Sequence, residues 1–279
     1  ANNGSVNEQV INIEFEKGTE STGTVKCSDI DFTANPTIEV SETCTNAING
    51  NWYTHPAFTF GNQELTGFWM GKFELSTTNE TCNTTSNVDN CNKVSTVTIK
   101  PNVNSWRSTT VSNFYTSIRN ISSDYSLTNV DSHMIKNMEW GAVAYLKQSK
   151  YGLGLTDIGI NNHNNGVSDR KTGCGAIAGS SSSTECNPYN TANGMLASTT
   201  GNIYGVYDMS GGAYEYTMSN MVDSAGAFYP SSSGFTTTPE AKYYDRYTYD
   251  ASSNITHARG KLGDATKETL KTFGNSYGG

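Results

Sequence analysis

The sequence predicts a mixed α+β fold with two helices, short strands and long loops. Short segments with the patterns of β-strands occur up to residue 99, and two apolar stripes with helical spacing follow. The next region, 153–200, is rich in Gly, Asn and Ser and contains no helix-length pattern. A chain of 279 residues is long enough for one large domain, or a main domain with a smaller partner, with a substantial core.

The first 50 residues are expected to form a small β module with a local disulfide. Three segments alternate apolar and polar side chains and are predicted strands: 10–15, 22–25 and 37–40. A turn-rich stretch at 46–51 marks the boundary of the module. The second predicted domain therefore spans residues 51–279.

The second domain begins with three further predicted strands: 57–60, 67–75 and 94–99. The first two are mainly apolar and flank a polar turn at 61–64, so we expect both to be buried. A loop that contains Cys82 and Cys91 precedes the third.

Two helices are predicted in the middle of the chain. The stripe of the first consists of Val111, Phe114, Tyr115, Ile118 and Ile121. Thr109 or Thr110 is its expected N-cap. The second helix is predicted from Ser132 to Tyr151, with Gly152 as the residue that ends it. A last short helix is predicted at 266–272, capped by Asp264.

Composition and charge narrow the classes of partner. Charged residues make up 16% of the chain, below the usual share of about 25%. The net charge of −8 argues against nucleic acid, which needs a basic face. No apolar run approaches the roughly 18 residues of a membrane helix, and no signal peptide opens the sequence at Ala1. We therefore expect a mature, soluble, exported protein.

The cysteines favour disulfides. They fall into three neighbouring couples: Cys27 and Cys44, Cys82 and Cys91, Cys174 and Cys186. Zinc is disfavoured because no C-x-x-C couple exists and the four histidines lie far from the couples. A reactive thiol would need a lone cysteine near a base. We therefore predict local pairing within each couple and an oxidising, extracellular compartment.

Two clusters of side chains could carry binding chemistry. The first is a tyrosine-rich segment with Tyr243, Tyr244, Arg246, Tyr247 and Tyr249. It would suit an exposed contact surface for carbohydrate or protein, or equally a β-strand whose tyrosines pack on the core. By contrast, His55 is interpreted as structural and His163 as a solvated loop residue.

The second cluster is the glycine-rich stretch 201–216, in which Asp208 and Glu215 lie seven residues apart. In a loop that curls around a point, two carboxylates and the carbonyls between them can supply the hard oxygen ligands that Ca²⁺ prefers. The alternative is a buried turn whose acids accept hydrogen bonds from backbone amides.

Three motifs resemble one known family. Residues 202–216 resemble the N-x-Y-G-L-x-D-M-x-G-N-V-W-E-W signature of the formylglycine-generating-enzyme, or sulfatase-modifying-factor, family. Residues 68–74 are similar to its F-x-M-x-K-Y-E strand, and residues 138–145 to its A-E-W-E-Y-A-A-R helix. The motifs occur in family order over residues 52–220. The resemblance implies a C-type-lectin-like fold.

The resemblance also implies a structural calcium ion. Carried over by motif position, its ligands would be the side chains of Asp208 and Glu215 and the main-chain oxygens of Gly211 and Ala213. Catalysis does not carry over in the same way. The formylglycine-generating members hold copper on a cysteine pair near the C-terminus, whereas no cysteine follows Cys186 here.

The leading expectation is an extracellular, non-enzymatic ligand-binding or adhesion protein on a bacterial or phage surface. It would be similar to the variable proteins of diversity-generating retroelements, and would bind protein or carbohydrate on a cell surface. A first alternative is a structural subunit of a filament, pilus or virion fibre, in which residues 1–50 pair with other copies of the chain. A second is a copper-dependent formylglycine-generating oxidase.

Overall fold

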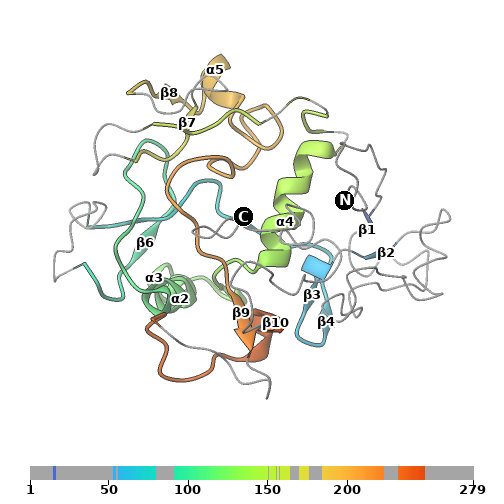
Figure 1. Ribbon diagram of the computed structural model, residues 1–279, viewed down its shortest axis with the longest axis vertical. Helices are drawn as coiled ribbons and strands as arrows, with labels where there is room; N and C mark the ends of the chain where they lie inside the picture. The colour runs from blue at the N-terminus through green and yellow to red at the C-terminus, as the bar shows by residue number, and fades with distance from the viewer. Residues whose placement is uncertain are drawn as a thin grey trace.

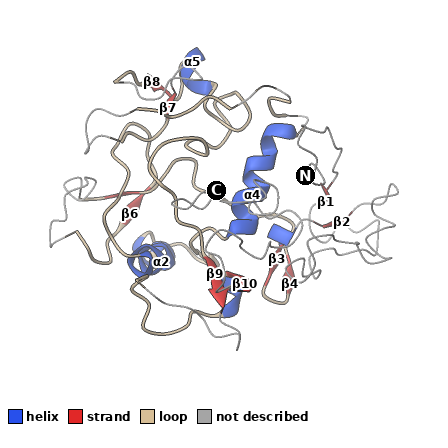
Figure 2. Ribbon diagram, viewed as in Figure 1, coloured by secondary structure: helices blue, strands red, loops and turns tan. Residues whose placement is uncertain are grey.

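A computed structural model describes residues 15–16, 53–54, 56–79, 91–149, 151–154, 156, 158–163, 170–175, 184–222 and 232–248. Over these residues the protein is a mixed α+β structure of short helices, two-stranded sheets and long loops (Figure 1). Long loops connect these short elements (Figure 2). The predicted α+β class is therefore confirmed.

The strands of the described residues form five two-stranded sheets. Two are parallel: β1 (Phe15–Glu16) with β2 (Tyr53–Thr54), and β9 (Ser219–Val222) with β10 (Asp245–Thr248). Three are antiparallel: β3 (Thr59–Phe60) with β4 (Gln63–Glu64), β5 (Ser76–Thr77) with β6 (Val97–Thr98), and β7 (Cys174–Gly175) with β8 (Asn187–Pro188). The predicted strand at 94–99 is thus present in part as β6, and the turn predicted at 61–64 is shorter because β4 begins at Gln63.

The predicted strand at 67–75 is absent. Its backbone makes isolated hydrogen bonds to two different loops, from Tyr207 N to Lys72 O and from Trp106 N to Leu75 O. Neither loop runs alongside as a strand, so no ladder forms. The segment is also not buried throughout, since Trp69 is fully exposed while Phe73 is in the core.

The helix α2 (Val111–Arg119) begins where the sequence predicts, directly after Thr110. The backbone amide of Asn113 donates to the Thr110 carbonyl, which closes the first turn. The apolar stripe of α2 packs on a buried cluster of Ile118, Met134, Met218 and Tyr244. A separate four-residue helix, α3 (Ile121–Asp124), follows.

The second predicted helix is shorter than expected. The helix α4 (Asn137–Ala144) and the 3-10 helix η4 (Tyr145–Gln148) replace the predicted span of 132–151. The start is late because the Glu139 carboxylate accepts the Lys136 amide at 2.8 Å, which fixes the helix N-terminus there. Upstream, Ile135 O accepts the Met218 amide and is held outside the helix. In Figure 1, α4 packs beside the 3-10 helix η2 (Pro56–Phe58).

The sequence predicts that Gly152 ends this helix in a left-handed conformation, but Gly152 does not have a positive φ. The positive φ of 60° belongs to Gly154 instead. A Cβ on Gly152 would lie 2.2 Å from the carbonyl oxygens of Leu146 and Lys147, so this position needs glycine for space.

The remaining short elements lie at the two ends of the view in Figure 1. β7, β8 and α5 (Ala192–Met195) are at the top, and β9 and β10 are at the bottom. The helix α5 is capped by Thr191, whose hydroxyl accepts the Gly194 amide at 3.1 Å. The 3-10 helix η5 (Ala241–Tyr243) leads into β10.

Among the described residues, three buried clusters make up the core. Besides the cluster against α2, one centres on Phe73, Ala197 and Tyr207, and the other on Cys91, Val97 and Trp106. The first of these joins the segment before β5 to the loop after α5. That loop is therefore anchored by side-chain packing.

Several predictions fall outside the described residues. They are the three predicted module strands, of which only Phe15 is described, the helix at 266–272, and His55, Cys27, Cys44, Cys82 and Tyr249. Within the described residues, no helix has the length and apolar character needed to cross a membrane.

Candidate functional site

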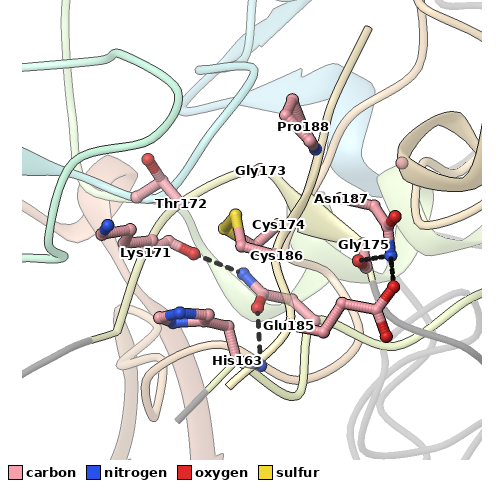
Figure 3. Close-up of a disulfide and its surroundings, with 12 residues drawn as sticks. His163, Lys171, Thr172, Gly173, Cys174, Gly175, Glu185, Cys186, Asn187 and Pro188 are labelled. Carbon is pink, nitrogen blue, oxygen red and sulfur yellow. Dashed lines mark hydrogen bonds between the residues drawn. A yellow bond between two sulfur atoms is a disulfide. The ribbon is translucent and has the colours of Figure 1, made fainter. Parts of the chain in front are cut away.

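A disulfide joins β7 to the residue directly before β8. Cys174 and Cys186 are bonded, with their Cα atoms 4.7 Å apart, as the sequence predicts for this couple. Figure 3 shows the Asn187 side chain beside it, donating to the Gly175 carbonyl at 3.0 Å and to the Glu185 carboxylate at 2.9 Å. Cys91 is also disulfide-bonded, to a partner outside the described residues.

The loop that carries the predicted calcium ligands is held by Asn161. The backbone N–H of Asn161 donates to the Ser210 carbonyl at 2.8 Å, and the backbone N–H of Gly212 donates to the Asn161 carbonyl at 2.6 Å. Gly211 and Gly212 have φ angles of 84° and 80°. A Cβ on Gly211 would lie 2.2 Å from Asn161 O, so the close approach requires a glycine.

Asp208 connects three separate segments through its buried carboxylate. The oxygen Oδ1 accepts from Asn161 Nδ2 at 2.8 Å and from Gly173 N at 2.9 Å. The oxygen Oδ2 accepts from Gly173 N at 3.1 Å and from Glu74 N at 3.2 Å. These contacts match the alternative in which the acid of a buried turn satisfies backbone amides.

Glu74 is a member of the site that the sequence analysis missed as a functional residue. Its carboxylate accepts the Ala213 amide at 2.9 Å and the hydroxyl of Ser105. Burial raises the pKa of Glu74 well above its usual range, and the charges of Asp208 and Glu215 raise it further. The sequence does offer one signal for Glu74, which is the one acidic residue in the mainly apolar segment 67–75.

Glu215 completes a group of three neighbouring carboxylates. The residue as a whole is exposed, but its Oε2 accepts the indole N–H of Trp140 at 2.6 Å. Desolvation raises the pKa of Glu215 to about 7, and the charge of Asp208 acts in the same direction. No ion pair among the described residues neutralises any of the three carboxylates. The three acids therefore disfavour one another's charged forms, which adds to the effect of burial on the pKa of Glu74 and Glu215.

The predicted calcium ligands fit an ion in part. The carbonyl oxygens of Gly211 and Ala213 accept no hydrogen bond from a described residue, and neither does Glu215 Oε1. Asp208 does not fit as a direct ligand, because each of its oxygens already accepts two hydrogen bonds. Within the described part of the chain, no three His, Cys, Asp or Glu side chains converge as a metal site.

The carboxylates predict an unusual dependence of stability on pH. A carboxyl group whose pKa rises on folding contributes most below its unfolded value and loses that contribution as pH increases. For Glu215 this loss falls between about 4.5 and about 7. With a chelator present, the melting temperature should therefore rise as pH falls from about 8 to about 5. Glu215→Gln should flatten this slope, and an equal slope in both proteins would contradict the assignment.

The tyrosine cluster is not the exposed surface that one interpretation of the sequence predicts. Tyr243 and Tyr244 are only 2% and 8% exposed, so the prediction is wrong for these two residues. The Tyr243 hydroxyl donates to Asp131 at 2.9 Å, and the Arg119 guanidinium lies 4.1 Å from the centre of its ring. Tyr244 packs in the core against α2.

Arg246 and Tyr247 of the predicted surface lie in β10, and only their backbone is described. The interpretation of His163 as a solvated residue is also wrong, because it is buried. Its carbonyl accepts Arg170 Nη1 at 3.3 Å, which ties the two ends of the surrounding loop together.

The exposed aromatic side chains occur elsewhere. Trp69 is fully exposed, and Tyr204, Tyr214 and Tyr216 are 89%, 81% and 59% exposed. These four residues, here called the exposed aromatic set, lie on two segments that hydrogen bonds join, from Tyr207 N to Lys72 O and from Glu74 N to Asp208. The sequence gives no direct signal for their exposure, because aromatic residues are as often found in a core.

No protein-family model matches this sequence, and neither a curated protein nor a solved structure was found to be similar to it. The resemblance to the formylglycine-generating-enzyme family therefore remains a matter of the three motifs.

Proposed function

We propose that the chain is an extracellular, non-enzymatic ligand-binding or adhesion protein that contacts protein or carbohydrate on a cell surface. The observation that carries this proposal is the exposed aromatic set, four large rings held outward on an anchored backbone. Rings of this kind offer apolar area with little loss of side-chain entropy, and tyrosine adds a polar tip. The buried Asp208 and Asn161 contacts support a rigid presentation of the loop.

The fold and location are part of the same proposal. A C-type-lectin-like domain is supported by the three motifs, of which 138–145 overlaps α4 and 202–216 forms the anchored loop. Display on a bacterial or phage surface is supported by disulfide-bonded Cys91, Cys174 and Cys186, which suit an oxidising compartment.

The proposed calcium ion would be held by Gly211 O, Ala213 O and the Glu215 carboxylate, with Asp208 fixing the loop behind them. A cation there would offset the repulsion among the three carboxylates. Chelation should then lower the melting temperature of the wild-type protein, and added calcium should restore it. Glu215→Gln should remove this sensitivity. A wild type that does not respond to a chelator would contradict the calcium proposal.

The binding proposal is tested by alanine substitution within the exposed aromatic set. Tyr214→Ala and Tyr216→Ala should each weaken binding of labelled protein to intact cells by about tenfold or more, because aromatic contact residues commonly contribute at least about 1.4 kcal/mol. Both variants should remain folded, as judged by a cooperative melting transition. Tyr125→Ala, at another exposed tyrosine, is the matched control. Full binding by both variants of the set would contradict the proposal.

A filament, pilus or fibre subunit is the second candidate, and a different surface favours it. Val94 and Ile99 are exposed on either side of β6, and the nearby Tyr125 hydroxyl donates to Val97 O. An apolar margin beside a short strand could pair with another copy. In the same assay, this candidate would be favoured if Tyr125→Ala, rather than the variants of the set, weakened self-association or binding.

The copper oxidase is the least supported candidate. Each described cysteine is held in a disulfide, so none offers a thiolate to a metal. Conversion of a sulfatase-type cysteine peptide to formylglycine by the purified protein with copper would revive it.

A further inference from the structure

We propose that Lys72 recognises the acid group of the ligand, and that the ligand is an acidic sugar, a pyranose ring that carries a carboxylate. This inference rests on the proposed binding function and adds the chemical class of its ligand. The occupied surface would comprise Lys72 with Trp69 and Tyr204, two members of the exposed aromatic set.

The Lys72 ammonium is held in place by aromatic faces. It donates to the carbonyl of Ile203. It also lies 5.1 Å from the ring centre of Tyr189, 5.6 Å from that of Tyr207 and 5.7 Å from that of Phe73. Contacts of this kind orient a cation but leave it without a neutralising charge.

Lys72 differs in this respect from two other lysines. Lys136 and Lys242 lie 3.7 Å and 3.0 Å from the carboxylates of Glu139 and Asp131. No carboxylate of a described residue forms an ion pair with Lys72. Desolvation also lowers the pKa of Lys72. A partly desolvated cation without an anion gains more from a ligand carboxylate than a paired surface lysine does.

The exposed rings lie next to this cation along the chain. Tyr204 directly follows Ile203, whose carbonyl holds the ammonium, and Trp69 precedes Lys72 by three residues. Both rings are at least 89% exposed. A flat aromatic ring stacks on the apolar face of a pyranose, and the single lysine can then bind one carboxylate on that sugar.

An acidic sugar fits this surface better than an acidic peptide. A peptide that binds in extended form usually adds a strand to a sheet edge. Neither 67–72 nor 201–205 is a strand, so these segments present no ladder for such pairing. These segments instead offer two exposed rings, Trp69 and Tyr204, and one cation, Lys72.

The experiment is calorimetric titration of the full chain with sialyllactose, an oligogalacturonate, lactose and tetraglutamate. At least one of the two acidic sugars should bind about tenfold or more tightly than lactose, because only the charged ligands pair with Lys72. Its affinity should fall as salt increases from about 50 to about 500 mM. Lys72→Met should weaken binding about tenfold, as should Trp69→Ala and Tyr204→Ala. Lys93→Met and Tyr151→Ala, the latter at an exposed tyrosine outside the set, are the matched controls and should bind like the wild type.

Three results with the wild type and one with a variant would overturn the inference. The wild-type results are binding of neither acidic sugar, binding of lactose equal to that of the acidic sugars, and tighter binding of tetraglutamate, which would indicate a peptide ligand. Undiminished binding by Lys72→Met would do the same. If Lys72→Met does not fold, the inference is tested with the wild type alone, by the salt dependence of binding and by the comparison with lactose. The binding function itself is tested separately, because it fails only if the variants of Tyr214 and Tyr216 bind intact cells fully.

Discussion

Asp208→Ala is expected to lower the free energy of unfolding by about 3 to 5 kcal/mol. The substitution leaves three donors without their acceptor, the amides of Glu74 and Gly173 and the side chain of Asn161. Each unsatisfied buried donor costs about 1 to 3 kcal/mol. Asp208 also has a positive φ of 65°, which costs alanine a further 1 kcal/mol or so. Denaturant unfolding of wild type and variant measures the loss.

Asp208→Asn is the matched control for this prediction. Asparagine keeps the shape of the side chain and tolerates the left-handed conformation, but it has one acceptor oxygen instead of two. An intermediate loss is therefore expected. Because the role of Asp208 is to accept hydrogen bonds, the loss in Asp208→Ala should persist when a chelator is present. A loss below about 1 kcal/mol would contradict the assignment of Asp208 as the anchor of the loop.

Removing the Cys174–Cys186 disulfide is expected to be nearly as costly. The bond closes a loop with a sequence separation of 12, and the chain-entropy model gives about 3 kcal/mol for a loop of that size. The β7–β8 sheet has only two residues in each strand, and α5 contacts both strands. Cys174→Ala combined with Cys186→Ala should therefore lower the free energy of unfolding by about that amount, as measured by denaturant unfolding.

Asn187→Ala distinguishes the contribution of the disulfide to stability from that of the neighbouring hydrogen bonds. It removes the hydrogen bonds to Gly175 and Glu185 but keeps the disulfide, and should cost only about 1 kcal/mol. A double cysteine variant as stable as Asn187→Ala would contradict a structural role for the disulfide.

Local signals in the sequence predicted the local structure. The spacing of apolar residues and the threonine before Val111 predicted the start of α2, because helix periodicity and capping depend on neighbouring residues. The short separation of Cys174 and Cys186 likewise favoured their pairing. The Gly, Asn and Ser content of 153–200 predicted loops, and its described residues are mostly loop apart from β7, β8 and α5.

Features that depend on distant partners were missed. The strand at 67–75 had a strand-like composition, but its partners are loops, so no ladder forms. Tyr243 and Tyr244 look like contact residues in the sequence, yet Asp131 and Arg119 bind the first and the core of α2 buries the second. Composition alone cannot tell which aromatic residues are covered.

In the candidate site, too, local features could be predicted and contacts between distant segments could not. The sequence identified Asp208 and Glu215 as a pair of acids in a glycine-rich loop, but not that Asp208 would be saturated by three donors. Glu74 lies more than 130 residues away along the chain and accepts the amide of Ala213. Such a contact requires the fold, because no local pattern connects the two segments.

The central claim is that this chain acts as a discrete binding protein rather than as a unit of an assembly. Negative-stain electron microscopy of the protein from its native source tests it most directly. The account predicts isolated particles at every concentration examined, with the exposed aromatic set available to a ligand. Regular filaments would contradict it and would make the chain an assembly subunit.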